Sequence, residues 1–381
     1  MAGATLRTAH GGQDGMTPDQ RAIIDRGGDH AGATRRGSGF VRMHYDLASE
    51  AQLAWTAFPY FEQWADLVGV GDCGFVNTGF VQLVAPDFAD ALRANVAMQQ
   101  GLGIETAVAA GDDVAQLVPG ISTDDIVAAA YEPRSGYADP GATAAGLLEA
   151  AVLRGARLDS GRLVAAVAVD GERVVGVETD AGRYAAPVVV NAAGPWAAQL
   201  ATTIGLALPV RVWRHDTFYL ALPDGRDNAF PIVLDHARQV YFRPDGSDQL
   251  LVGLETANAL GGSPDRGFDP IGDAETAALR ARLEARLPWM AGATLRTAHG
   301  GQDGMTPDQR AIIDRVGPEG HYLLCGFSGS GFKTAPATGL AMAELILDGA
   351  AHSVDVSAYG LERFAAGAPL VGEHAYPDLW Q

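Results

Sequence analysis

The sequence predicts a two-domain α/β protein in which a domain built on a parallel sheet is interrupted twice by antiparallel, β-rich segments. Three observations support this prediction. The chain of 381 residues is too long for one ordinary domain. Its hydrophobic residues (48%) can form a large core, and its charged residues (19%) are too few for a disordered chain. Helix and strand patterns alternate at both ends and in the middle, which is typical of a nucleotide-binding domain interrupted by a substrate domain.

We expect the nucleotide-binding domain in residues 1–70, 138–205 and 288–381, and the substrate domain in 71–137 and 206–287. The helix expected over 139–156 has a full set of end signals, with Asp139 as N-cap, Pro140 in the first turn and Gly155 as the stop. Residues 162–194 fit strands joined by an Asp-Gly turn. The other expected elements are helices over 48–68, 274–290 and 334–349, a hairpin-like strand pair over 74–86, antiparallel strands over 217–255 and a strand over 321–325.

Charge and composition narrow the classes of partner. A net charge of −19 without a clustered basic stripe argues against nucleic acid and against anionic membrane surfaces. No apolar run reaches the roughly 18 residues of a membrane span, and the first residues lack the pattern of a signal peptide. The two cysteines, Cys73 and Cys325, lie far apart without metal-ligand spacing. We therefore expect no disulfide framework, no metal site and a cytoplasmic location.

One segment of the chain occurs twice. Residues 1–26 are identical to residues 290–315. Structural repeats are similar rather than identical, so a verbatim copy indicates a recent duplication or an assembly accident more than a functional array. The second copy lies between an expected helix and an expected strand. The first copy lacks such a context, which indicates that it is the misplaced one.

Glycine-rich turns are candidates for binding phosphate groups. A literal G-x-G-x-x-G pattern, Gly69 to Gly74, follows a helix and precedes a strand, which reverses the order that dinucleotide binding requires and favours a loop. The segment 325–336 (CGFSGSGFKTAP) follows a strand and opens a helix, whose N-terminus attracts negative charge. It contains Lys333, the single lysine of the chain. A plain glycine-rich turn is the alternative.

Two further segments suit ligand binding. Residues 188–197 (VVVNAAGPWA) are an expected buried strand that ends in a turn of small residues, where a backbone can approach a ligand. An ordinary strand end is the alternative. Residues 32–46 (GATRRGSGFVRMHYD) place Arg35, Arg36 and Arg42 among glycines, which suits capture of a phosphate or carboxylate. A solvated basic loop explains this segment equally well.

These segments together carry a resemblance to a known family. GDHAGATRRGSGFVRMHY, GYADPGA, VVVNAAGPWA, GMTPDQRAIID and GFSGSGFK resemble, in order and spacing, the signature blocks of the D-amino-acid oxidase superfamily. The sarcosine oxidase and glycine oxidase branch is the most similar, and the match covers roughly residues 25–350. The resemblance implies an FAD-binding Rossmann-like domain interrupted by an antiparallel β-rich substrate domain. It also implies FAD as cofactor and a small amino acid or amine as substrate.

The resemblance implies roles for individual residues. Arg42 and Lys333 match positions that clamp a substrate carboxylate, and Tyr241 matches a tyrosine of the substrate pocket. The positions that match cofactor contacts are Asp25 at the ribose, Thr34 and Arg35 near the pyrophosphate or flavin, Val164 at the adenine, Ala193, Gly194 and Trp196 flanking the cofactor, and Gly326, Gly329, Gly331, Phe332 and Lys333 at the flavin ring.

The sequence departs from the family pattern in three places. The N-terminal βαβ unit with its glycine fingerprint is missing or altered, because the duplicated segment stands in its place and the match resumes near residues 22–26. Gly301 stands where some relatives attach flavin through a cysteine, so we expect noncovalent FAD. Leu251 stands where sarcosine oxidases carry the lysine that activates oxygen, so we expect reduced flavin to react poorly with oxygen.

The predicted function is oxidation of the C–N bond of a small amino acid or secondary amine. The resemblance implies hydride transfer to flavin and an imine that water hydrolyses. The alternative is a rearranged, non-catalytic remnant that binds FAD weakly or not at all, which the missing fingerprint favours. A nicotinamide dehydrogenase is disfavoured because no fingerprint lies between a strand and a helix.

Overall fold

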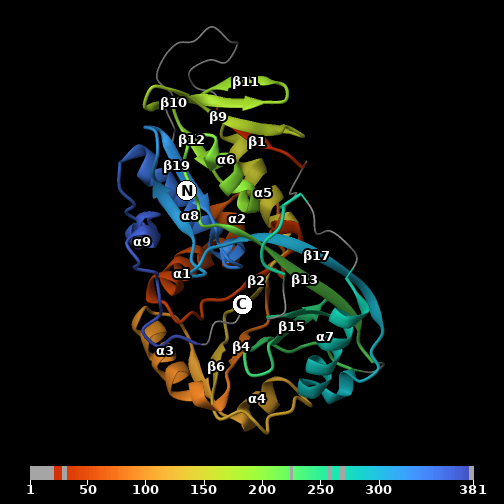
Figure 1. Ribbon diagram of the computed structural model, residues 1–381. Coiled ribbons are helices and arrows are strands. Elements are labelled where there is room, and N and C mark those ends of the chain that lie inside the picture. The colour runs from red at the N-terminus through yellow and green to blue at the C-terminus, as the bar shows by residue number, and fades with distance from the viewer. Residues whose placement is uncertain (1–20, 28–31, 224–225, 256–258, 266–270, 377–381) are drawn as a thin grey trace.

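A large mixed sheet forms the lower right part of the molecule (Figure 1). The computed structural model describes residues 21–376 except 28–31, 224–225, 256–258 and 266–270. The neighbours in the large sheet are antiparallel apart from β4 and β14, which are parallel. Its order is β17 (Leu295–Met305), β13 (Arg211–Ala221), β16 (Gln249–Leu254), β15 (Val240–Asp245), β14 (Ile232–Asp235), β4 (Phe80–Leu83), β6 (Ala129–Glu132) and β5 (Ala107–Ala109).

The parallel strands form two separate pieces. In one, β1 (Arg21–Asp25) pairs in parallel with β8 (Ala156–Ser160). In the other, β12 (Val189–Asn191) pairs in parallel with β19 (His321–Cys325), which pairs antiparallel with β18 (Ile312–Arg315). A Rossmann-type sheet has the strand order 3-2-1-4, so its first strand lies between the second and the fourth. Among the described residues no strand pairs with the second edge of β1 or of β12.

Two smaller antiparallel sheets complete the strand set. One contains β9 (Val164–Asp170), β10 (Arg173–Thr179) and β11 (Gly182–Ala185), and it confirms the strands expected around the Asp-Gly turn, where Gly171 has φ +58°. The other contains β2 (Phe40–Val41), β7 (Gly136–Tyr137) and β3 (Val76–Asn77).

The strand pair expected over 74–86 is wrong as a hairpin. Although β3 and β4 both form, β3 pairs with β7 while β4 lies between β14 and β6. All four residues of β4 are buried and both residues of β3 are exposed. A strand buried on all sides needs partners at both of its edges, and these come from distant parts of the chain.

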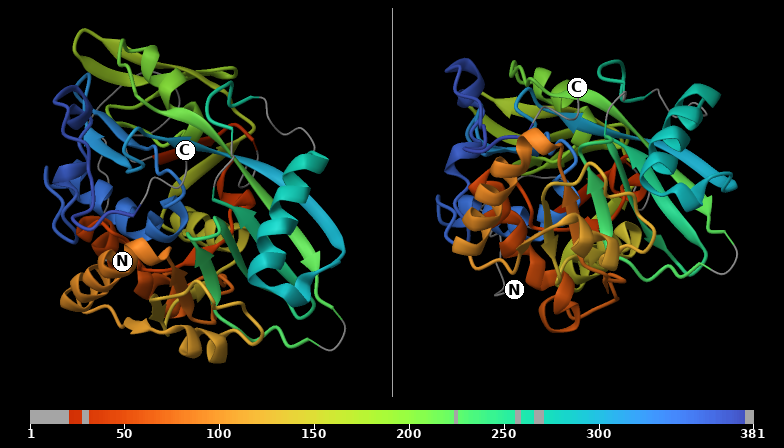
Figure 2. Two further views of the ribbon diagram at one scale, coloured as in Figure 1. Left: turned by 60° about the horizontal axis from the view of Figure 1, so that its bottom comes forward. Right: turned by 90° about the horizontal axis from the view of Figure 1, so that it is seen from below.

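The helices cover the sheets and confirm the expected helical segments. The helix expected over 48–68 is interrupted at Gln63. The helix expected over 139–156 forms, and Asp139 caps it by accepting a hydrogen bond from the Ala142 amide (2.8 Å). The α-helices are α1 (Ala48–Glu62), α2 (Trp64–Leu67), α3 (Ala89–Gly101), α4 (Gly111–Leu117), α5 (Pro140–Leu153), α6 (Ala197–Thr202), α7 (Asp273–Arg286), α8 (Gly331–Leu347) and α9 (Glu362–Ala365). The 3₁₀ turns used below are η1 (Thr34–Arg36) and η3 (Gly194–Trp196). Figure 2 shows α7 lying along the large sheet.

The two copies of the repeat differ in their structural context. Residues 1–20 lie outside the described residues, but Arg21–Asp25 and the identical residues 310–314 can be compared. The first copy forms β1, which pairs in parallel with β8, whereas the second contributes to β18, which pairs antiparallel with β19. Ile23 is 39% exposed and its counterpart Ile312 is fully buried. Identical local sequence therefore does not fix the partner of a strand.

A buried ion pair connects α7 to the large sheet. The side chains of Arg286 and Asp235 are both fully buried, and Arg286 Nε donates to Asp235 Oδ2 at 2.5 Å. The guanidinium also bonds the Ser122 carbonyl (2.5 Å) and the carboxylate of Asp125 (2.8 Å). Every donor group of this cation is thereby directed at the interface between α7, β14 and the loop at residues 122–125.

Asp235→Ala should strongly destabilise the fold. The substitution leaves the Arg286 charge buried without its main partner, which typically costs about 3–5 kcal/mol of the free energy of unfolding. Urea unfolding followed by circular dichroism measures this loss. Asp90→Ala is the matched control, because the ion pair of Asp90 with Arg93 is exposed. Equal stability of the two variants would contradict this account.

Candidate active site

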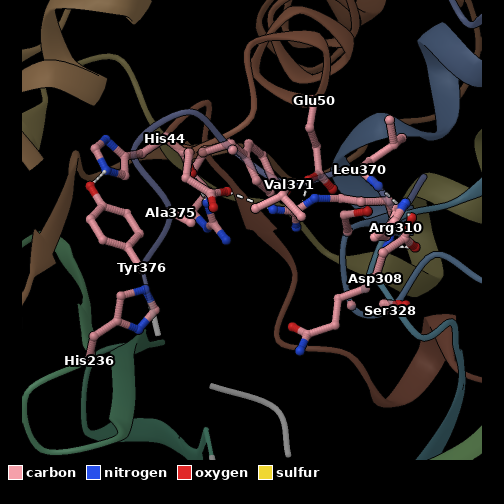
Figure 3. A pocket seen from close by; sticks show the side chains of 18 of the residues that line it. His44, Glu50, His236, Asp308, Arg310, Ser328, Leu370, Val371, Ala375 and Tyr376 are labelled. Atoms are coloured by element: carbon pink, nitrogen blue, oxygen red, sulfur yellow. Dashed lines mark hydrogen bonds and ion pairs between the residues drawn. The ribbon is translucent and has the colours of Figure 1, made fainter. Parts of the chain in front are cut away.

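A cavity of about 330 Å³ lies where several parts of the chain meet. Most of its walls come from the segment after β2, the start of α8 with the turn before it, the loop after β14, the loop at residues 307–310 and the C-terminal residues 369–376 (Figure 3). Arg42 and Tyr45 contribute from the first of these and Lys333 from the second. The structure thus brings together Arg42 and Lys333, which the sequence predicts as a pair.

Arg42 and Lys333 both approach the ring of Tyr45. The guanidinium of Arg42 lies 4.3 Å from the ring centroid, and Lys333 Nζ lies 5.8 Å from it. Lys333 is 6% exposed and donates to the Gly329 carbonyl (3.1 Å), while Arg42 donates to the His44 carbonyl. Within the described residues neither cation has a carboxylate partner, and the buried Tyr45 hydroxyl has no hydrogen-bond partner. Two cations and a free hydroxyl in one cavity suit a carboxylate ligand.

The other charges around the cavity are paired with each other. Arg310 bonds Asp46 (2.7 Å) and Glu50 (3.0 Å), and Arg363 bonds Asp308 (2.7 Å). These pairs neutralise the carboxylates that could otherwise bind Arg42 or Lys333. The excess positive charge of the cavity therefore comes from Arg42 and Lys333.

Burial shifts the pKa values of two side chains that line the cavity. Desolvation, with Arg42 acting in the same direction, lowers the pKa of Lys333 to about 7, while Glu50 and Asp303 act to raise it. Desolvation also lowers the pKa of His44 to about 3, with Arg42 acting in the same direction. At neutral pH the walls therefore contain a charged arginine, a lysine near its midpoint and a neutral histidine.

The turn at residues 326–330 is fixed to β17 before α8 begins. The Ser328 amide donates to the Gly304 carbonyl (3.0 Å), and the Gly329 amide donates to Asp303 Oδ2 (2.8 Å). Gly326 (φ +67°) and Gly329 (φ +89°) need glycine, and Ser328 takes a positive φ of 52°. A Cβ at Gly326 would lie 2.7 Å from the Thr306 side chain. The turn is preorganised, which is typical of a binding site.

Three other predicted residues, Tyr241 of the substrate pocket and Gly331 and Phe332 at the flavin, do not line this cavity. Tyr241 is buried outside the residues that line the cavity, where it shares a 2.6 Å hydrogen bond with His215. Phe332 packs against Phe61, with ring centroids 5.5 Å apart. A Cβ at Gly331 would lie 3.0 Å from Phe327. The roles of Tyr241, Gly331 and Phe332 remain predictions.

The other residues predicted to contact the cofactor lie at the end of β1, in η1, at the start of β9 and just after β12. The carboxylate of Asp25 accepts from the Gly27 amide (2.8 Å), and Arg26 lies 5.5 Å from the ring centroid of Trp196. Asp265 bonds both Arg26 and the indole of Trp196. The remaining predicted residues are Thr34 and Arg35 in η1, Val164 at the start of β9, Ala193 before η3, and Gly194 in η3, where open space surrounds the position of a Cβ.

A family model described as "FAD dependent oxidoreductase" matches residues 16–345. The chain belongs to this family. The mouse sarcosine dehydrogenase is 29% identical over 282 residues, which are 71% of this chain and 30% of that protein. The chain thus spans less than a third of this relative. The sarcosine oxidase β-subunit of an Arthrobacter species is 25% identical over 93% of this chain and 86% of its own length.

A solved structure shows that the fold is shared. L-proline dehydrogenase from P.horikoshii superposes with a TM-score of 0.83 over 92% of each chain, at 22% sequence identity. The predicted fold class, an FAD-binding α/β domain interrupted by an antiparallel β-rich domain, is thereby confirmed. The division into five segments remains a prediction. Within the described part of the chain, no helix of this family member combines the length and hydrophobicity needed to cross a bilayer.

FAD is the cofactor of this family. The described residues suit the flavin half of FAD better than its adenosine diphosphate half. The preformed turn at 326–330, the open space beside Gly194 and the cations near the turn suit the flavin ring. The adenosine diphosphate half needs a glycine turn between a central strand and a helix. No such unit occurs among the described residues, where β1 and β12 each lack a partner on one edge.

Sequence reasoning missed two residues of the site. Tyr45 carries no motif of its own, although it follows Arg42 closely in VRMHYD. Asp303 lies within the repeated segment, and its carboxylate reaches Gly329 only because β17 runs beside the turn. A spacing pattern cannot signal either contact, because each depends on elements that are distant in sequence.

Binding of acetate to the full chain should weaken as pH rises through about 7. Lys333 is charged below its pKa of about 7, and a carboxylate favours the charged form. Affinity should therefore be highest below pH 7 and fall by up to about tenfold per pH unit above it. The charged and titratable groups facing Lys333 are Arg42, Tyr45, Glu50, Asp303 and His215.

Calorimetric titrations with acetate at several pH values measure this dependence. Lys333→Met is the control and should bind more weakly with a flat profile across this range. A pH dependence that persists unchanged in Lys333→Met would assign the titration to another group.

Proposed function

We propose that this chain oxidises the C–N bond of a small amino acid or secondary amine, with noncovalently bound FAD as cofactor. The observation that supports this most directly is the pair of cations, Arg42 and Lys333, which flank Tyr45 without a carboxylate partner among the described residues. An amino acid supplies the missing carboxylate. The substrates named for relatives of this chain, among them sarcosine dehydrogenase, sarcosine oxidase and glycine oxidase, agree with this substrate class.

The chain contributes binding and orientation to the proposed reaction. Arg42 and Lys333 would hold the substrate carboxylate, and the Tyr45 hydroxyl would donate a further hydrogen bond. This anchoring would direct the carbon beside the nitrogen towards the turn at 326–330. When bound, FAD would supply the acceptor for the hydride that leaves this carbon. Water would then hydrolyse the imine.

Arg42→Ala and Lys333→Met should each weaken binding of an amino acid substrate. Removal of one partner from a buried charged contact costs about 2–5 kcal/mol of binding free energy. Steady-state kinetics with sarcosine, glycine and L-proline should show a raised KM in both variants. Arg93→Ala, on the exposed face of α3, is the control. Unchanged kinetics in both cavity variants would overturn the carboxylate clamp.

The split parallel sheet supports a second candidate, a remnant that retains FAD poorly. Ile23 on β1 and Val190 on β12 are 39% and 37% exposed, although strands of this kind are normally buried on both faces. Several backbone N–H bonds to the pyrophosphate would be missing, each worth roughly 1.5–3 kcal/mol. The loss of two such bonds would lower the affinity on the order of a hundredfold or more.

Bound FAD should therefore be removed by extensive dialysis. The ratio of flavin absorbance to protein absorbance before and after dialysis measures this retention. Replacement of residues 1–20 by a strand, a G-x-G-x-x-G turn and a helix should restore tight binding. Stoichiometric FAD in the dialysed, unmodified chain would refute this account.

A further inference from the structure

The C-terminal residues 369–376 form a wall of the cavity that contains Arg42 and Lys333. This segment, which we call the C-terminal strap, lies beyond residue 345, where the match to the family model ends. Two backbone contacts fix it in place. The Leu370 amide donates to Asp308 Oδ2 (3.0 Å), and Asn95 Nδ2 donates to the His374 carbonyl (2.9 Å).

Tyr376 is the aromatic side chain that the strap contributes to the cavity lining. Its hydroxyl shares a 2.8 Å hydrogen bond with His44 Nε2, and its ring stacks on His44 with centroids 5.9 Å apart. The ring of His236 lies on the side of Tyr376 away from His44, and the centroids of the His236 and Tyr376 rings are 5.6 Å apart (Figure 3). His44 and His236 are held in turn by Gln99 (3.0 Å) and Glu255 (2.8 Å). Tyr376 is therefore fixed between two anchored rings.

The rings of His44, Tyr376 and His236 form an aromatic wall that offers no free charge to a ligand. Burial lowers the pKa of His44 to about 3 and raises the pKa of Tyr376 above its ordinary range, so both groups are neutral. The imidazole of His236 is already bonded to the carboxylate of Glu255. A charged substituent placed against this wall would lose its hydration without gaining a partner, which is unfavourable.

We propose that Tyr376 restricts the substrate of this site to amino acids with a small, uncharged substituent. The inference rests on the proposed function, since it assumes that the carboxylate binds at Arg42 and Lys333. Arg42 donates to the backbone carbonyl of His44, so the carboxylate clamp and the aromatic wall are adjacent. The cavity volume of about 330 Å³ is at the small end for ligand pockets, which agrees with a small substrate.

The test compares two carboxylates that differ in the bulk of the substituent. Acetate and phenylacetate are titrated calorimetrically into the full chain, into Tyr376→Ala and into a chain that ends at residue 372. Tyr184→Ala is the matched control, because Tyr184 belongs to β11 and does not line the cavity. Thermal unfolding of each variant verifies that it is folded. The truncated chain provides a second answer should Tyr376→Ala not fold.

The wild type should bind acetate and discriminate against phenylacetate. Tyr376→Ala and the truncated chain should bind phenylacetate more tightly by on the order of tenfold, with little change for acetate. An unchanged ratio of the two affinities in both variants, or a wild type that binds both ligands equally, would overturn the role of Tyr376. Failure of the proposed function has a different signature, namely acetate binding that is absent or that Arg42→Ala does not weaken.

Discussion

The hydrogen bonds between β17 and the turn at 326–330 are the constraint on which the site depends. The carboxylate of Asp303 accepts a hydrogen bond from the amide of Gly329. The carbonyl of Gly329 in turn accepts a hydrogen bond from Lys333. The turn thereby fixes both the start of α8 and the position of the lysine. Because α8 packs against α1 through small residues such as Ala57 and Ala337, the segment that carries Arg42 is held at a defined distance. A shift of β17 would therefore move one cation relative to the other.

The cavity keeps Arg42 and Lys333 near each other without an ion-pair partner among the described residues. This arrangement is unfavourable in the empty site, because burial and mutual repulsion both oppose the charge on Lys333. Glu50 and Asp303 offset these effects only in part, since desolvation and Arg42 are the larger causes of the lowered pKa of Lys333. A carboxylate bound between Arg42 and Lys333 would oppose both effects, and the proposed site would thereby select an anion.

The split parallel sheet bears differently on the two proposed halves of cofactor binding. The proposed flavin side relies on the turn at 326–330, which the structure describes in full. The nucleotide side relies on a central strand and its glycine turn, which the described residues do not supply. The contacts of Asp265 with Arg26 and Trp196 join the ends of β1 and β12 across this region. The proposed substrate clamp and the proposed nucleotide site thus depend on different parts of the chain.

The sequence by itself determined the fold class, the position of the helix α5 and the choice of Arg42 and Lys333 as a pair. Capping residues, glycine turns and apolar periodicity are local signals, and the end signals at Asp139 and Gly155 suffice to place α5. Only the tertiary structure decided which strands pair and what lines the cavity. The strands β3 and β4 separate into different sheets, and Ile23 is exposed in β1 whereas its identical counterpart Ile312 is buried in β18. Tyr45, Asp303 and Tyr376 reach the site through contacts between distant elements. Such contacts depend on packing and burial across the whole chain, which no local pattern records.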